Sequence, residues 1–239
     1  MFLQTSISHL FILLLYFPLS SNAYYSYEYN ITDCDYGNGT YKKDSPYHDN
    51  LKLLLDSLSN STPITGYFQD KKHSSNDSND VFGHALCRGD VQLLEDCSPC
   101  LINAVSQIGK FCPKKKNAAV LYENCFLRYS NQKFFGIPTG TERFINFTAE
   151  ISKNNREKFI KVREKLFEKL LREATNGTKS PSLFDLGKEV VTSDLTVYGL
   201  VQCTRDLSKE DCHDCLKILI QRFPDISYYK VGLVITRLV

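Results

Sequence analysis

Apolar residues recur at helical spacing in four parts of the chain. Within Pro46–Asn60, the residues Leu51, Leu54, Leu55 and Leu58 lie on one helical face, which predicts an amphipathic helix. The same spacing predicts three more helices, over residues 94–108, 157–174 and 208–223. Short β-type runs predict strands over residues 81–86, 118–122, 125–129 and 196–204.

The pattern repeats along the chain. One motif occurs in both Val81–Leu101 and Val197–Leu216. It consists of VxG, three residues and Cys, followed by a segment that ends in Glu-Asp-Cys, two residues and Cys-Leu. The two copies are offset by 115 or 116 residues. Two copies of one domain explain the repeat. Each copy is expected to be α+β, with two helices packed on one face of a small antiparallel sheet.

The N-terminus has the form of a secretory leader. Leu10–Leu19 is apolar and Ser20–Ala23 is small and polar, which predicts a signal peptide over residues 1–23. The apolar run is shorter than the roughly 20 residues that span a bilayer, and no later run reaches that length. The sequence therefore predicts a first domain over 24–136, a linker over 137–145, a second domain over 146–239, and secretion without a membrane anchor.

Glycosylation sequons are consistent with secretion. Six N-x-S/T sites are present, and they mark surface segments of an exported protein. They are Asn30, Asn38, Asn60, Asn76, Asn146 and Asn176. The net charge of +2 is too small to argue for a nucleic-acid partner.

The nine cysteines allow three interpretations. Two C-x-x-C pairs could supply four zinc thiolates, and Cys97–Cys100 could form a redox pair. Export favours a third, structural disulfides, because thiols pair in an oxidising lumen. We therefore expect no metal and no cofactor, but six cysteines allow fifteen connectivities and the residues alone do not choose among them.

The motif Cys203, Cys212 and Cys215, with C-x8-C-x2-C spacing, together with "VYGLVQC" and "CHDCL", resembles the plant cysteine-rich repeat secretory proteins, which are built from ginkbilobin-homologous domains. In the first copy, nine residues rather than eight separate Cys87 from Cys97. The resemblance implies four disulfides: Cys34–Cys112, Cys87–Cys97, Cys100–Cys125 and Cys203–Cys212. It leaves Cys215 outside any disulfide.

The second copy is expected to be incomplete at its C-terminal end. At the repeat offset, the partner of Cys215 and the strand that matches residues 125–135 fall beyond Val239. Either the product is truncated, or another chain completes the domain, in a dimer through Cys215. A lost strand would expose a sheet edge.

The sequence contains little that indicates a catalytic site. His84, His213 and Cys215 suggest a Cys/His nucleophile, but residues two apart on a helix face away from each other. The tripeptide Arg88–Asp90 could be an adhesion motif, yet Gly and Asp there also suit a tight turn. We expect no enzyme activity and treat the tripeptide as a turn.

The resemblance also implies a mannose site formed by Asn, Arg and Glu. Asp35, Ala119 and Ser130 hold these positions here, so the charged hydrogen bonds that would orient the sugar are lost and no mannose binding is expected. The family implies a secreted binding module of the plant apoplast, in defence or cell-surface signalling, whose partner is an unidentified extracellular protein or glycan. The alternatives are a mannose-binding antifungal lectin and an ectodomain fragment of a cysteine-rich receptor-like kinase.

Overall fold

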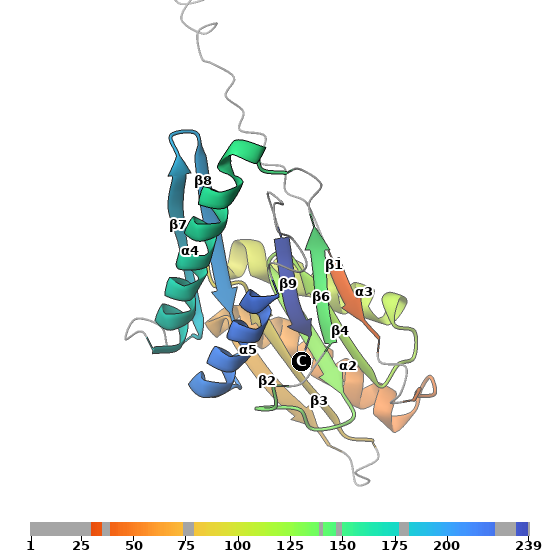
Figure 1. Cartoon of the computed structure of the whole chain (residues 1–239). Helices are drawn as coiled ribbons and strands as arrows, with labels where there is room; N and C mark the ends of the chain where they lie inside the picture. The colour runs from red at the N-terminus through yellow and green to blue at the C-terminus, as the bar shows by residue number, and fades with distance from the viewer. Residues whose placement is uncertain are drawn as a thin grey trace, which may run out of the picture.

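The first domain is a five-stranded antiparallel sheet covered on one face by two helices (Figure 1). The computed structural model describes residues 30–34, 39–73, 79–138, 141–146, 150–176, 182–222 and 233–238. The predicted leader, Asp35, Asn38 and Asn76 lie outside these ranges. The strands, in sheet order, are β1 (Asn30–Asp33), β4 (Asn117–Tyr122), β5 (Cys125–Ser130), β3 (Val81–Cys87) and β2 (Tyr67–Lys72).

Helix α2 (Pro46–Thr65) follows the predicted pattern but is five residues longer than expected. Ser45 caps its start by accepting a hydrogen bond from the His48 N–H. Gly66 ends it in the left-handed region, at φ 82°, where a residue without Cβ is favoured. The predicted leucine stripe, except for the half-buried Leu55, is buried against the sheet, which stabilises the helix by removing apolar surface from water.

The second predicted helix has two parts. A π-helical turn, η2 (Leu93–Cys97), precedes the α-helix α3 (Ser98–Phe111). Pro99 lies in the first turn of α3, where its missing N–H costs no helical hydrogen bond. Leu101, Ala104 and Ile108 are buried on the face that packs toward the sheet, as the stripe predicts.

The second domain repeats this order of elements. Its described elements are β6 (Thr141–Asn146), η3 (Lys153–Asn155), α4 (Arg156–Asn176), β7 (Phe184–Thr192), β8 (Leu195–Gln202), α5 (Lys209–Gln221) and β9 (Leu233–Leu238). Helix α4 covers the β7–β8 hairpin closely, since a Cβ on Gly199 would lie 2.8 Å from a methyl carbon of Leu170. No helix in the described ranges is long and apolar enough to cross a bilayer.

The sheet of the second domain is divided. The repeat offset of 116 residues makes β8 the counterpart of β3 and β9 the counterpart of β4. Adding 116 to the bounds of β4, 117–122, gives the bounds of β9, 233–238. In the first domain β5 lies between β3 and β4 and pairs with both. Among the described strands of the second domain, β8 pairs only with β7, and β9 pairs only with β6.

The two domains contact each other through equivalent loops. After β3, Gly89 donates its N–H to Gln202 Oε1 at 3.1 Å, and Gln202 Nε2 donates to the Cys87 carbonyl at 3.0 Å. After β8, Arg205 Nη1 donates to the Thr65 carbonyl at 2.8 Å. Each loop therefore binds the other domain near the start of its β-hairpin.

The Arg88–Asp90 tripeptide belongs to this domain contact. Arg88 and Asp90 form an ion pair of 2.6 Å with each other. A Cβ on Gly89 would lie 2.5 Å from the ring of Phe184, so only glycine allows the second domain to approach this closely.

We expect Gly89→Ala to destabilise the protein by about 1–3 kcal/mol, because the Phe184 ring must move away from an added methyl group. Urea unfolding followed by circular dichroism measures the change. Gly109→Ala is the matched control, since nothing lies within 4 Å of a Cβ there and alanine favours a helix. Equal stability of Gly89→Ala and the unmodified protein would contradict this account of the contact.

Candidate functional site

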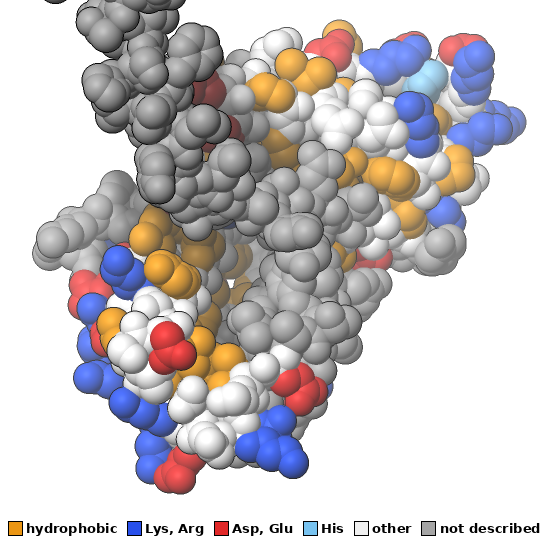
Figure 2. All heavy atoms as spheres, turned by 90° about the horizontal axis from the view of Figure 1, so that it is seen from above, with side chains coloured by type: hydrophobic (Ala, Val, Ile, Leu, Met, Phe, Trp, Pro, Cys, Tyr) orange, Lys and Arg blue, Asp and Glu red, His pale blue; other side chains and the backbone are white. Residues whose placement is uncertain are grey.

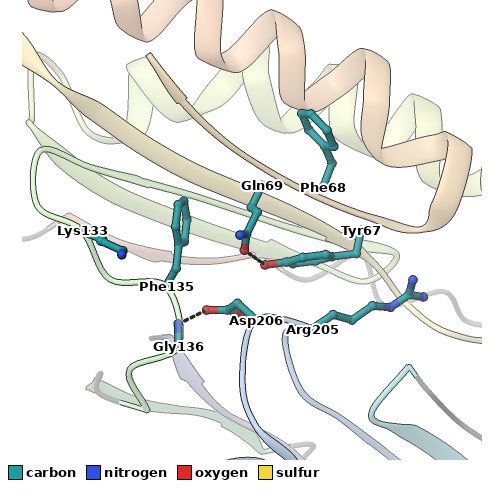
Figure 3. Close-up of a pocket in the computed structure, with 8 residues that line it drawn as sticks. All are labelled: Tyr67, Phe68, Gln69, Lys133, Phe135, Gly136, Arg205 and Asp206. Carbon is teal, nitrogen blue, oxygen red and sulfur yellow. Dashed lines mark hydrogen bonds between the residues drawn. The ribbon is translucent and has the colours of Figure 1, made fainter. Parts of the chain in front are cut away.

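A groove lies at the junction of the two domains (Figure 3). It has a volume of about 650 Å³ and is open to solvent. Three chain segments line this junction groove: β2, the segment after β5, and the loop between β8 and α5. Its residues are Tyr67, Phe68, Gln69, Lys133, Phe135, Gly136, Arg205 and Asp206.

Hydrogen bonds hold the three segments together. The Gly136 N–H donates to Oδ2 of Asp206 at 2.8 Å, across 70 residues of sequence. Gly136 has a φ of 73°, the left-handed region that favours glycine. Arg205 reaches the other side of the groove through its bond to Thr65. The groove therefore depends on the contact between the two domains.

A buried His–Asp pair adjoins the junction groove: Asp206 lines the groove, and His84 faces Asp206 from the first domain. His84 of β3 has 1% of its side chain exposed and Asp206 has 5%, and Nδ1 of His84 lies 3.6 Å from Oδ1 of Asp206. Within the described residues, neither ring nitrogen of His84 has a hydrogen-bond partner. The same holds for Oδ1 of Asp206. Phe134 and Phe126 enclose the imidazole, with ring centroids at 5.0 and 5.5 Å.

Burial and neighbouring charges shift these groups. Burial lowers the pKa of His84, and the positive charge of Arg128 lowers it further, whereas Asp206 opposes the shift. Burial alone would raise the pKa of Asp206, but His84, the Gly136 N–H and Thr204 hold it well below its ordinary value. Burial, followed by the negative charge of Asp206, raises the pKa of Tyr67. At neutral pH, Asp206 is therefore ionised and His84 is neutral.

The rim combines cations and aromatic rings. Figure 3 shows Lys133 and Arg205 at opposite ends of the groove, with Tyr67 and Phe135 between them. The Tyr67 hydroxyl donates to Oε1 of Gln69 at 2.8 Å. Cations, ring faces and amide groups in one open groove suit non-covalent recognition of a polar, negatively charged ligand.

The sequence did not single out this groove. None of its eight residues forms a known motif, and they come from three distant segments. The available signal was the aromatic run Phe134–Phe135 beside Lys133, at the end of the strand segment 125–135. Asp206 was noted only as the repeat counterpart of Asp90.

The residues at the family's sugar positions lie elsewhere in the first domain. Ala119 on β4 is 4% exposed and packs in a small apolar cluster. Ser130 on β5 is 2% exposed, and its hydroxyl accepts a hydrogen bond from the Gln132 N–H. Neither side chain presents a polar group to solvent.

Eight of the nine cysteines form disulfides in the structure: Cys34–Cys112, Cys87–Cys97, Cys100–Cys125 and Cys203–Cys212. Cys97 and Cys100 therefore bind different partners, and neither has a thiolate for zinc or redox exchange. Two of the disulfides close the loops that make the domain contact. Cys87–Cys97 encloses Gly89, and Cys203–Cys212 encloses Arg205 and Asp206.

The remaining candidates are not among the residues that line the groove. Cys215 is a thiol on α5 with 8% exposure. His213, two residues before it, is directed to Asp214 at 3.3 Å. The sequons at Asn60 and Asn176 lie at exposed positions, within α2 and at the last residue of α4.

The buried His84 predicts a loss of stability in mild acid. Its folded-state pKa is below the ordinary 6.5, so as the pH falls through 6.5 the unfolded chain binds more protons than the folded chain, and folding becomes less favourable. We expect His84→Leu to weaken this pH dependence, measured as the free energy of unfolding at pH 7 and 5. Leucine is the residue at the equivalent position 200. An unchanged difference between the two pH values would contradict the assignment.

Comparison with known proteins supports the repeat. The family model for salt stress response/antifungal domains (Stress-antifung) matches twice, over residues 33–132 and 146–232. An antimicrobial ginkbilobin-2-like protein of Castanea crenata is 35% identical over 193 residues, which are 81% of this chain and 77% of that protein. Cysteine-rich repeat secretory protein 55 of Arabidopsis thaliana is 34% identical over 82% of this chain and 73% of its own length.

Receptor proteins are also among the relatives. Cysteine-rich receptor-like protein kinase 25 of Arabidopsis thaliana is 35% identical over 81% of this chain, but the match spans only 28% of the kinase. The tandem DUF26 ectodomain of the Arabidopsis thaliana cysteine-rich receptor-like protein PDLP8 superposes with a TM-score of 0.71 at 27% identity, covering 87% of this chain and 93% of that one. The two matched domains, the identity to the relatives over most of the chain and the common fold show that the chain belongs to the salt stress response/antifungal (DUF26) family of cysteine-rich repeat proteins.

Proposed function

We propose that this chain is a secreted recognition module of the plant apoplast that binds an extracellular ligand in the junction groove, and that it is not an enzyme. The observation that carries the proposal is the open groove lined by cations and aromatic rings, with Asp206 hydrogen-bonded to Gly136 across it. This bond joins two walls of the groove and fixes their positions, and a preformed site binds at a lower entropic cost.

The extracellular setting is supported by the relatives, whose names describe secretory and receptor-like proteins. Cleavage after Ala23, a first domain over 24–136, a second domain that extends the predicted 146–239 to include β6 (Thr141–Asn146), and glycans on the six sequons are part of the proposal. The antimicrobial relative and the receptor-like relatives support a role in defence or cell-surface signalling.

The charges on the surface favour local recognition over a broad electrostatic field. On the face drawn in Figure 2, Lys and Arg side chains lie along the outer edges and are interspersed with Asp and Glu. A patch of one sign would attract polyanions over a long range. The specificity we propose therefore resides in the groove.

A receptor-ectodomain fragment is the second candidate. The similarity to the tandem ectodomain of PDLP8 over 93% of its length favours it. This candidate places the same groove outside a membrane, so it shares the proposed ligand site.

Phe135→Ala should abolish ligand binding at the groove. The test applies the secreted full-length chain to arrays of plant cell-wall glycans and synthetic peptides, followed by titration of every ligand found. We expect at least a tenfold loss of affinity in the variant, since buried aromatic contacts dominate binding energy. Phe111→Ala, at an exposed position of α3, is the matched control. Equal affinity of the Phe135 variant for every ligand would overturn the proposal.

Mannose is expected not to bind. Ala119 and Ser130 are buried and lack the charged hydrogen bonds of the family's sugar site. Calorimetric titration of the secreted chain with mannose should give no saturable heat. Saturable binding that Ser130→Ala removes would favour the mannose-binding lectin instead.

A further inference from the structure

Strand β2 forms an open edge of the first domain's sheet beside the junction groove. It is the last strand in the sheet order and pairs only with β3 among the described strands. Cys87 donates its N–H to the Gly66 carbonyl, so Gly66, Phe68 and Asp70 direct their backbone groups toward β3 in this antiparallel register. The backbone groups of Tyr67, Gln69 and Lys71 point away from the sheet.

Two of these outward residues are already engaged. The Tyr67 carbonyl accepts a hydrogen bond from the Thr65 hydroxyl at 2.7 Å. The Lys71 N–H donates to its neighbour Asp70 at 2.7 Å. Gln69, between them, is exposed and lines the groove. Its N–H and C=O are therefore a donor and an acceptor that an added strand can reach.

The charges beside this edge favour an acidic ligand. Lys133 and Arg205 lie at the two ends of the groove. The carboxylate of Asp206 offsets one of these two charges, so the groove lining keeps a net positive charge. Lys72, on the same strand, is paired with Asp70 at 2.6 Å. The accessible rim therefore has an excess of positive charge.

The two faces of β2 present different surroundings to the side chains of an added strand. Figure 3 shows Tyr67 and Gln69 directed into the groove, whereas Phe68 points to the opposite side, toward α2. Side chains of an added strand alternate in the same way. Residues on the groove side meet Lys133 and Arg205, and residues on the other side meet the ring of Phe68.

We propose that the junction groove binds an extended acidic peptide segment of a partner protein, which adds to the edge of β2 as a strand and hydrogen-bonds to the backbone of Gln69. Acidic residues alternate with apolar residues in this segment. The inference rests on the proposed function and names its ligand class. Main-chain bonds provide affinity in such strand addition, and alternate side chains provide specificity.

The test uses the secreted full-length chain and the peptide acetyl-Glu-Val-Glu-Val-Glu-Val-amide. We expect saturable binding that weakens as salt is added, because exposed ion pairs are screened. The same peptide with Gln for Glu should bind at least about tenfold more weakly, and the Lys version should not bind. Equal binding of the Glu and Gln versions would overturn the acidic ligand class.

Backbone pairing is tested by Gln69→Pro against Gln69→Ala. Both variants remove the side-chain bond to Tyr67, but only proline removes the outward N–H, and an edge strand tolerates proline where its N–H faces solvent. We expect Gln69→Pro to bind the peptide about tenfold more weakly than Gln69→Ala, because only proline lacks the outward N–H. Equal binding by the two variants would overturn strand addition.

A peptide with alternate N-methylated residues gives the same test without altering the protein. It should lose binding, because it cannot donate to the Gln69 carbonyl. Retained binding would contradict the pairing even if Gln69→Pro fails to fold. If an acidic oligosaccharide binds and the peptide does not, the peptide class is wrong, whereas the groove stands as long as Phe135→Ala removes that binding.

Discussion

The contact of Asp206 with the first domain is the interaction on which the arrangement of the two repeats depends. One carboxylate receives the Gly136 N–H and faces the buried ring of His84. Removing such a charge from water is unfavourable unless neighbouring dipoles replace the lost hydration. The lowered pKa of Asp206 shows that its surroundings favour the charged form, so the carboxylate joins two domains that a short linker alone would leave independent.

The disulfides make this contact possible by restricting the loops. Cys87–Cys97 and Cys203–Cys212 close the two equivalent connections between a strand and a helix. Closing a loop removes conformations of the unfolded chain and so stabilises the folded form. The loop that carries Gly89 and the loop that carries Arg205 and Asp206 are therefore both held in place. In this protein the repeated cysteine motif stiffens the surfaces that recognise the other repeat.

The contacts are equivalent in position but different in chemistry. Where the first loop has Gly89 against the ring of Phe184, the second has Arg205 bound to the Thr65 carbonyl. His84 of β3 has Leu200 as its counterpart on β8. One side of the junction is thus packed closely around a glycine, and the other carries charge and opens into a groove. The two copies of one domain have therefore diverged at their boundary, and the groove lies there.

The sequence by itself determined the helices, four of the nine described strands and the repeat, because periodicity and cysteine spacing are local. The leucine stripe of Leu51, Leu54 and Leu58 and the cap at Ser208 can be recognised without a fold. Strands β1, β2, β6, β7 and β9 were not predicted, since strand formation depends strongly on neighbours across the sheet. Only the tertiary structure decided that Gly136 and Asp206, 70 residues apart, are hydrogen-bonded, and that Arg205 reaches Thr65 across 140 residues. The groove is formed by such distant contacts, and no local pattern encodes them.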